Sequence, residues 1–205
     1  MTRKKEKGIL EFRFFGRIYR FATESGIFSY REVDSGTGIL LETLVKVLSS
    51  GGTGISRINI RDASVLDLGC GYGVIGIVLA DIFRPRRVVM LDNDPRALSL
   101  ARKNVRDMNL NNVEILRSDI CSGLSPDERF DLIVTNPPIK YGRSTVLRFM
   151  TGGREHLSPG GEFWCVIMSR HGARRYLESM KVIFDGSEIY ERESGYMVLR
   201  GWVNG

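Results

Sequence analysis

The 205-residue sequence predicts an α/β fold, namely a doubly wound, mostly parallel sheet of seven strands preceded by a short β-hairpin. Two observations lead to this fold class. From residue 63 onward, short apolar runs alternate with segments whose apolar residues recur at helical spacing, which is the pattern of strands joined by crossover helices. The turn after the first apolar run is rich in glycine, as is typical where such a sheet binds a ligand.

The N-terminal stretch is basic and predicts the hairpin. Residues 10–14 alternate apolar and charged side chains, Gly16 breaks the pattern, and residues 18–21 form a second strand-like run. We expect arginines on one face of this hairpin, where they bind a polyanion or stay solvated while the hairpin covers an edge of the main sheet. Only Glu6 and Glu11 oppose the basic residues before position 21, which are Arg3, Lys4, Lys5, Lys7, Arg13, Arg17 and Arg20.

A helix is expected after the loop that covers residues 26–38. Asp34 or Ser35 is placed to cap it, and apolar residues follow at helical spacing from Leu40 to Leu48. The serine- and glycine-rich connector 49–54 comes next. It predicts a boundary between an N-terminal extension, residues 1–54, and a core, residues 55–205.

The core pattern gives the seven strands and the helices between them. The strands are expected at 65–68, 88–92, 113–116, 130–135, 162–168, 182–190 and 196–202, with helices after the glycine-rich turn and over 95–108, 144–155 and 170–180. Ligands of doubly wound sheets bind beyond the carboxyl ends of the strands. Gly69, Asp92, Asp119 and Asn136 are therefore expected around one crevice.

The glycine-rich turn is the stretch around which the chain is organised. Glycines at 69, 71 and 73 let the backbone turn sharply and a ligand approach closely, and the helix that follows presents a positive end. Asp67 would repel a pyrophosphate but suits an ammonium group. S-adenosylmethionine carries an ammonium, a carboxylate, a ribose and an adenine, and no phosphate. The stretch from Asp67 through Gly69, Gly71 and Gly73 resembles the first motif of class I S-adenosylmethionine-dependent methyltransferases.

Two further acids are candidates for the same ligand. Asp92 ends the second core strand, near the spacing expected for a carboxylate that binds a ribose diol. Asp119 follows the third core strand, where it can accept from the adenine amino group or cap a helix.

Asn136, Pro137 and Pro138 form the second chemically informative stretch. Two prolines directly after a buried strand fix a rigid, extended turn. We expect the Pro137 carbonyl to lack a regular partner and to point into the crevice beside the side-chain oxygen of Asn136. Two such acceptors can hold both hydrogens of an amino group and turn its nitrogen lone pair toward an electrophile.

Together these motifs resemble methyltransferases that modify planar nitrogen. The segment from Gly26 to Thr37 is similar to the entry segment of the small-domain ribosomal-RNA guanine-amino methyltransferase group. That resemblance implies that Phe28 and Thr37 border the cofactor or the substrate. Family members usually carry an aromatic residue where this chain has Ile139, so Tyr141 or Phe28 is expected to supply the stacking on a flipped base.

Composition narrows the partners and the compartment. The net charge is +6 and the isoelectric point about 9.4, which favours nucleic acid as a partner. We expect no membrane span, no secretory signal and no metal site, because Cys70, Cys121 and Cys165 lack metal-ligand spacing and only two histidines are present. Free cysteines fit a reducing cytoplasm.

The sequence thus predicts an S-adenosylmethionine-dependent methyltransferase acting on an exocyclic amino nitrogen of guanine or adenine in ribosomal or other RNA. A protein glutamine amide or a small molecule is the alternative acceptor. A non-catalytic RNA-binding or cofactor-sensing module and a nicotinamide oxidoreductase are disfavoured by Asn136, Pro137 and Pro138. The target nucleotide and the oligomeric state stay open.

Overall fold

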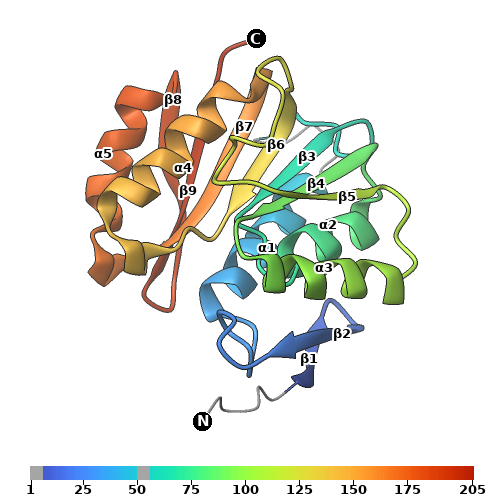
Figure 1. Cartoon of the computed structure of the whole chain (residues 1–205). Helices are drawn as coiled ribbons and strands as arrows, with labels where there is room; N and C mark the ends of the chain where they lie inside the picture. Colours follow the sequence, from blue (N-terminus) through green and yellow to red (C-terminus); the bar gives the residue numbers. More distant parts are fainter. Residues whose placement is uncertain (1–6, 50–55) are drawn as a thin grey trace.

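The computed structural model describes residues 7–49 and 56–205, and its centre is the main sheet (Figure 1). Its strands are β3 (Ser64–Leu68), β4 (Arg87–Asp92), β5 (Val113–Arg117), β6 (Phe130–Thr135), β7 (Leu157–Met168), β8 (Gly186–Glu193) and β9 (Tyr196–Trp202). They lie in the order β5-β4-β3-β6-β7-β9-β8. β3 to β7 are mutually parallel, and β9 runs antiparallel between β7 and β8. The predicted fold class is confirmed.

Helices cover both faces of the sheet. They are α1 (Ser35–Leu48), α2 (Val74–Phe83) and α3 (Pro95–Asp107) on one face, and α4 (Arg143–Glu155) and α5 (Ala173–Ile183) on the other, with short 3-10 helices η1 (Ile139–Tyr141) and η2 (Ser169–His171). Alternate strand residues enter the two layers: Val65 packs with α1, α2 and α3, whereas Leu66 packs with α4 and α5. This alternation follows from the period of two in a strand.

Some predicted boundaries differ from the observed ones. Residues 182 and 183 belong to the last turn of α5, so β8 begins only at Gly186. β7 begins at Leu157, which pairs with Phe130, and Glu162 then pairs with Leu132. The residues between them form a bulge in which Gly160 has a φ of +75°, so the turn that the residue types suggest is kept as an irregularity inside the strand.

α1 lies against the main sheet. Its N-cap is Asp34, one of the two predicted candidates, whose side chain accepts from the Thr37 N–H. The helix packs on β7, β9 and α2. The predicted division at residues 54 and 55 falls in the segment 50–55, outside the described residues, and it stays a prediction.

The predicted hairpin is present as β1 (Lys7–Phe14) and β2 (Arg17–Glu24), paired only with each other. The expectation that it covers an edge of the main sheet was wrong, because it packs on α3 and reaches α2, whereas the edge strands are β5 and β8. Its arginines also do not share one face. Arg13 and Arg20 lie on the outer face, but Arg17 is on the inner face and pairs with Asp81 of α2.

A buried asparagine fixes the hairpin to the core. The side chain of Asn104 in α3 accepts from the Ala22 N–H at 2.7 Å and donates to the Ala22 carbonyl at 3.1 Å. It also donates to the carbonyl of Tyr72, in the glycine-rich turn, at 2.9 Å. One side chain therefore joins β2, α3 and the loop after β3.

We expect Asn104→Ala to lower the free energy of unfolding by about 2–4 kcal/mol, because it removes these bonds and leaves buried backbone groups without partners. Urea unfolding of the full chain measures this. Ser99→Ala, at an exposed position of the same helix, is the control and should change stability by less than about 0.5 kcal/mol. An effect of Asn104→Ala no larger than that of the control would contradict this account of hairpin docking.

Candidate functional site

The candidate site lies at the edge of the sheet where the parallel strands end. The glycine-rich turn follows β3, Asp92 ends β4, Asp119 follows β5 and Asn136 follows β6. Because neighbouring parallel strands end at one edge, these four segments border the same side of the molecule.

The glycine-rich turn has a backbone that only glycine adopts readily. The φ angles of Gly69, Gly71 and Gly73 are +79°, +58° and +100°. The N–H groups of residues 69 and 70 both donate to the Leu91 carbonyl at 2.8 Å, which docks the turn on the end of β4. A Cβ on Gly73 would lie 2.7 Å from the Met90 side chain, whereas a Cβ on Gly71 would meet no atom within 4 Å. The turn is thus packed beneath Gly73 and open at Gly71.

Asp67 lies beneath this turn and is fully buried. Its Oδ2 accepts from the Gly76 N–H in α2 at 2.8 Å, and its Oδ1 has no partner among the described residues. The pKa of Asp67 is raised to about 7, chiefly by burial; the hydrogen bond from Gly76 opposes this shift, and the nearby charge of Asp92 adds to it. The sequence placed this carboxylate beside the ammonium of a ligand. Here it supports the start of α2, and its contact with a cofactor stays a prediction.

Asp92 and Asp119 have different surroundings. The two carboxylate oxygens of Asp92 accept from the N–H groups of Gly71 and Asp94, both at 2.8 Å, which leaves each oxygen one further acceptor direction. Asp119 is exposed and pairs with Arg148 of α4 at 2.9 Å. It caps no helix, because β6 is the next described element after β5. Their predicted contacts with ribose and adenine stay predictions.

Asn136 has a defined side-chain orientation. Its Nδ2 donates to Asp34 Oδ1 and to Thr37 Oγ1, both at 2.8 Å. A carboxylate oxygen only accepts, so the amide nitrogen must face Asp34 and the amide oxygen must point away from it. The arrangement leaves Asn136 Oδ1 as an acceptor. Thr37, which the sequence placed at the border of the cofactor or substrate, is buried and holds Asn136.

The turn after Asn136 differs from the prediction in one respect. We expected the Pro137 carbonyl to lack a regular partner, but it accepts from the Ile139 N–H at 2.8 Å. This tight turn leads directly into η1, and the carbonyl keeps a second lone pair. Ile139 is partly buried and packs against the apolar layer beneath α4 and α5.

Two aromatic side chains stand exposed on the segments that meet at Asn136. Phe28 in the loop before α1 is 59% exposed, and Tyr141 at the end of η1 is 66% exposed. Single exposed apolar side chains are common, and Ile9 and Val182 are more exposed than either, so exposure alone assigns these two aromatic residues no role. The stacking role predicted for both residues stays a prediction.

Sequence reasoning missed two links that complete the site. Asp34 was expected only to cap a helix, and no local pattern reveals its contact with a residue 102 positions away. Tyr72 donates its hydroxyl to the Ser29 carbonyl at 3.1 Å, which ties the loop before α1 to the glycine-rich turn. Burial, and secondarily the charge of Asp34, raises the pKa of Tyr72, so this hydroxyl stays protonated as a donor.

A groove of about 740 Å³ lies between the hairpin and the outer part of α3, beside the contacts that join them. Arg96, Lys103 and Arg106 of α3 line one side and residues of β1 and β2 line the other. Arg96 lies in the first turn of α3, directly after Asp92 and Asp94, so the groove begins at the site edge. The sequence analysis did not single out these basic residues of α3.

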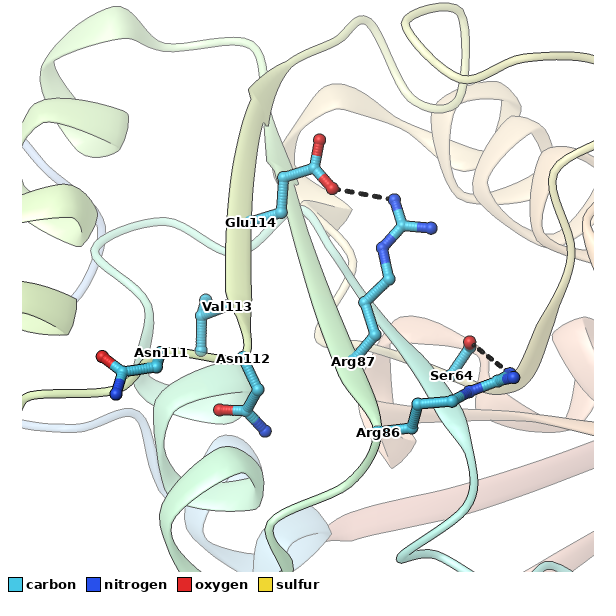
Figure 2. Close-up of a pocket in the computed structure, with 7 residues that line it drawn as sticks. All are labelled: Ser64, Arg86, Arg87, Asn111, Asn112, Val113 and Glu114. Carbon is cyan, nitrogen blue, oxygen red and sulfur yellow. Dashed lines mark hydrogen bonds and ion pairs between the residues drawn. The ribbon is translucent and has the colours of Figure 1, made fainter.

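A second cavity, of about 590 Å³, lies at the opposite edge, where β3, β4 and β5 begin. Figure 2 shows its polar lining, with Arg87 facing Glu114 and Arg86 facing Ser64. Arg87 also pairs with Glu128 at 2.6 Å. The charge of Arg87 is thus balanced within the fold, and this cavity is distinct from the candidate site.

A family model described as the methyltransferase small domain matches residues 18–200. The chain belongs to this family. This small-domain methyltransferase is 33% identical to YbxB of Bacillus subtilis (strain 168) over 197 residues, 96% of this chain and 92% of YbxB. It is 37% identical over 141 residues to the ribosomal RNA small subunit methyltransferase C of Mannheimia succiniciproducens, which covers 67% of this chain and 38% of that protein.

A solved structure is also similar to this small-domain methyltransferase. The T. thermophilus 16S rRNA N2 G1207 methyltransferase RsmC, in complex with AdoMet and guanosine, matches with a TM-score of 0.84 and 28% identity. The match covers 97% of this chain and 51% of RsmC. The chain thus spans about half the length, or less, of the ribosomal RNA methyltransferases named here, but nearly all of YbxB. No described helix of this small-domain methyltransferase is long and apolar enough to cross a membrane.

The raised pKa of Asp67 predicts a pH-dependent stability. The Asp67 carboxyl keeps its proton up to about pH 7 in the folded chain, but only up to about pH 3.8, its ordinary pKa, in the unfolded chain. The free energy of unfolding of the wild type therefore falls as the pH rises through that interval. Asp67→Asn removes the titration and keeps an oxygen for the Gly76 N–H. We expect the stability of this variant relative to wild type to rise by about 1–3 kcal/mol between pH 5 and pH 8, measured by urea unfolding.

Asp62→Asn is the matched control for this measurement, because Asp62 is exposed just before β3. Its stability difference from wild type should be nearly the same at both pH values. A pH-independent difference for Asp67→Asn as well would show that the Asp67 carboxyl titrates alike in the folded and unfolded chain.

Proposed function

We propose that this protein transfers a methyl group from S-adenosylmethionine to an exocyclic amino nitrogen of a guanine or adenine in ribosomal or other RNA. The orientation of the Asn136 amide is the observation that carries the proposal. With both amide hydrogens directed to Asp34 and Thr37, Oδ1 is left to accept a hydrogen from a substrate amino group.

The residues of the crevice fit S-adenosylmethionine. Each carboxylate oxygen of Asp92 can accept one ribose hydroxyl in addition to its backbone donor. The open side of Gly71 gives a ligand room to approach the loop. The N-cap of α2 is Gly73, which has no side chain to bond the first N–H groups of the helix, so this positive end suits a carboxylate. The AdoMet in the RsmC structure supports the same assignment.

When bound, S-adenosylmethionine supplies a methyl group that is already activated by its sulfonium. The protein then has to position the acceptor. Asn136 Oδ1 and the second lone pair of the Pro137 carbonyl would each accept one amino hydrogen. Pro138 keeps the turn rigid, and Phe28 and Tyr141 are available to stack on the base.

The cysteines favour direct attack by the amino group. All three cysteines are free and buried, and burial is the main reason that the pKa of each thiol is raised. A thiolate nucleophile, which a covalent route through the base would need, is therefore disfavoured in the crevice. The absence of a metal from the reaction stays a prediction, as does the location in the cytoplasm, where free thiols persist.

The groove between the hairpin and α3 supports RNA as the substrate class. Arg106 lines this groove and Arg13 lies outside it, on the outer face of the hairpin; neither makes an ion pair with another described residue. Lys103 pairs with Asp107, an exposed contact that a phosphate can replace at little cost. The ribosomal RNA named as the substrate of the similar methyltransferases agrees with such a surface.

We expect Asn136→Ala to reduce turnover by at least about 100-fold, equivalent to roughly 2.7 kcal/mol, because the acceptor amine loses its positioning oxygen. Transfer of tritiated methyl groups to unmodified ribosomal RNA measures turnover, and calorimetry measures cofactor affinity. The affinity should change by less than about twofold, in contrast to Asp92→Ala, where we expect a loss of about 10-fold or more.

Asn111→Ala, at an exposed position near the opposite edge, is the control and should keep wild-type turnover. Retained activity in Asn136→Ala would remove the turn after β6 from the mechanism. Activity on a protein glutamine amide but on no RNA would replace the proposed substrate by the alternative one.

A second prediction concerns RNA binding. The triple variant Arg13→Gln, Lys103→Gln and Arg106→Gln should weaken RNA binding and flatten its salt dependence, because fewer counterions are released. Since the variant can neutralise three fewer phosphates, the slope of log K against log salt concentration should fall by about 2 in magnitude. Fluorescence anisotropy with labelled RNA over a range of salt concentrations measures this slope.

The matched control carries the same loss of charge at the opposite edge. Arg61→Gln, Arg129→Gln and Lys181→Gln change exposed residues that precede β3, β6 and β8. Equal slopes for the two triple variants would mean that Arg13, Lys103 and Arg106 affect RNA binding only through the net charge of the protein.

A further inference from the structure

The most specific unassigned contact in the site joins the cap of α1 to the turn after β6. Asp34 Oδ1 accepts from two donors, the Thr37 N–H at 3.0 Å and Asn136 Nδ2 at 2.8 Å. The carboxylate sits in a confined place, since a Cβ on Gly36 would lie 3.0 Å from this oxygen and 2.8 Å from the ring of Tyr196. A local helix cap therefore also reaches the residue proposed to bind the acceptor.

We propose that Asp34 is a charged positioning residue for methyl transfer, which orients and polarises the Asn136 amide, with Thr37 as its auxiliary. This inference rests on the proposed function, because it assigns the device that directs Asn136 Oδ1 toward the acceptor amine.

Asp34 decides the orientation, and Thr37 cannot do so alone. If the Asn136 amide turned by 180°, its oxygen would face the Asp34 carboxylate, and two acceptors would repel each other with no hydrogen between them. The hydroxyl of Thr37 both donates and accepts, so it tolerates either orientation. Only the carboxylate distinguishes the nitrogen of the amide from its oxygen.

The charge of Asp34 also suits the reaction. During transfer the amino nitrogen uses its lone pair to form the bond to the methyl carbon, while the electron pair of the sulfur–carbon bond stays on sulfur. The nitrogen carries a positive charge until one proton leaves to water. An anion that accepts one of the two Nδ2 hydrogens of Asn136 makes the amide oxygen a stronger acceptor, and hydrogen bonds in a chain polarise one another in this way.

Two substitutions separate this role from the helix cap. Serine is also a good N-cap, so Asp34→Ser keeps a partner for the Thr37 N–H. The serine side chain is one heavy atom shorter than that of aspartate and does not reach Asn136. We expect the kcat of Asp34→Ser to fall by about 30-fold, while its KM for RNA stays within about threefold of the wild-type value. Its melting temperature should stay within about 2 °C of that of the wild type. Asp34→Asn keeps an oxygen for both donors but removes the charge, and its kcat should fall by about fivefold.

Thr37 provides a test of rescue. Thr37→Val removes the hydroxyl without changing the shape of the side chain, and its kcat should fall by about threefold. Thr37→Ser restores the hydroxyl and should return kcat to near the wild-type value. Ser35→Ala, at an exposed position in the same turn of α1, is the control and should leave kcat unchanged.

A measurement without substrate keeps this inference separable from the proposed function. In the full chain, the side-chain NH2 resonances of Asn136 should be protected from exchange with water, and Asp34→Ser should remove that protection. Unchanged protection in Asp34→Ser would overturn the orientation. Loss of protection with wild-type kcat would overturn the positioning role. A wild-type protein inactive on every RNA would overturn the proposed function, and the resonances would still decide the orientation.

Discussion

The shape of the glycine-rich turn depends on side chains from three other parts of the fold that bond its backbone. Asp67 of β3 accepts from Gly76 at the start of α2, Asp92 of β4 accepts from Gly71, and Asn104 of α3 donates to the Tyr72 carbonyl. A turn with three positive φ angles does not form a regular ladder, so its polar groups need such partners. The turn is thereby held in place before any ligand arrives, which is what a binding loop requires.

The loop before α1 completes the site, although it precedes the core strands in sequence. Tyr72 holds this loop at Ser29, directly after Phe28, and Asn136 holds its end at Asp34, so the stretch from Ser29 to Asp34 is fastened to the sheet edge at both ends. The same loop connects to the hairpin, whose strand β2 is fixed by Asn104 at the Ala22 backbone and by Asp81 at the Arg17 side chain. These contacts therefore connect the crevice, the loop before α1 and the hairpin.

The relation to longer relatives gives this arrangement a context. The chain corresponds to about half of RsmC but to nearly all of YbxB. The residues that border the crevice, from Phe28 to Tyr141, lie within residues 18–200, which the family model matches.

The sequence by itself determined the alternating strands and helices, the glycine-rich turn at the end of β3, a cap of α1 at Asp34 or Ser35, and the position of Asn136 after β6. These features follow from periods of apolar residues and from local backbone requirements, which neighbouring residues express directly. Only the tertiary structure decided that Asp67 is buried beneath α2, that Arg17 faces inward to Asp81, and that the Pro137 carbonyl has a partner. It also decided the contact between Asp34 and Asn136. Pairing between residues 102 positions apart arises from how α1 and β6 pack together, and no local pattern along the chain encodes that distance.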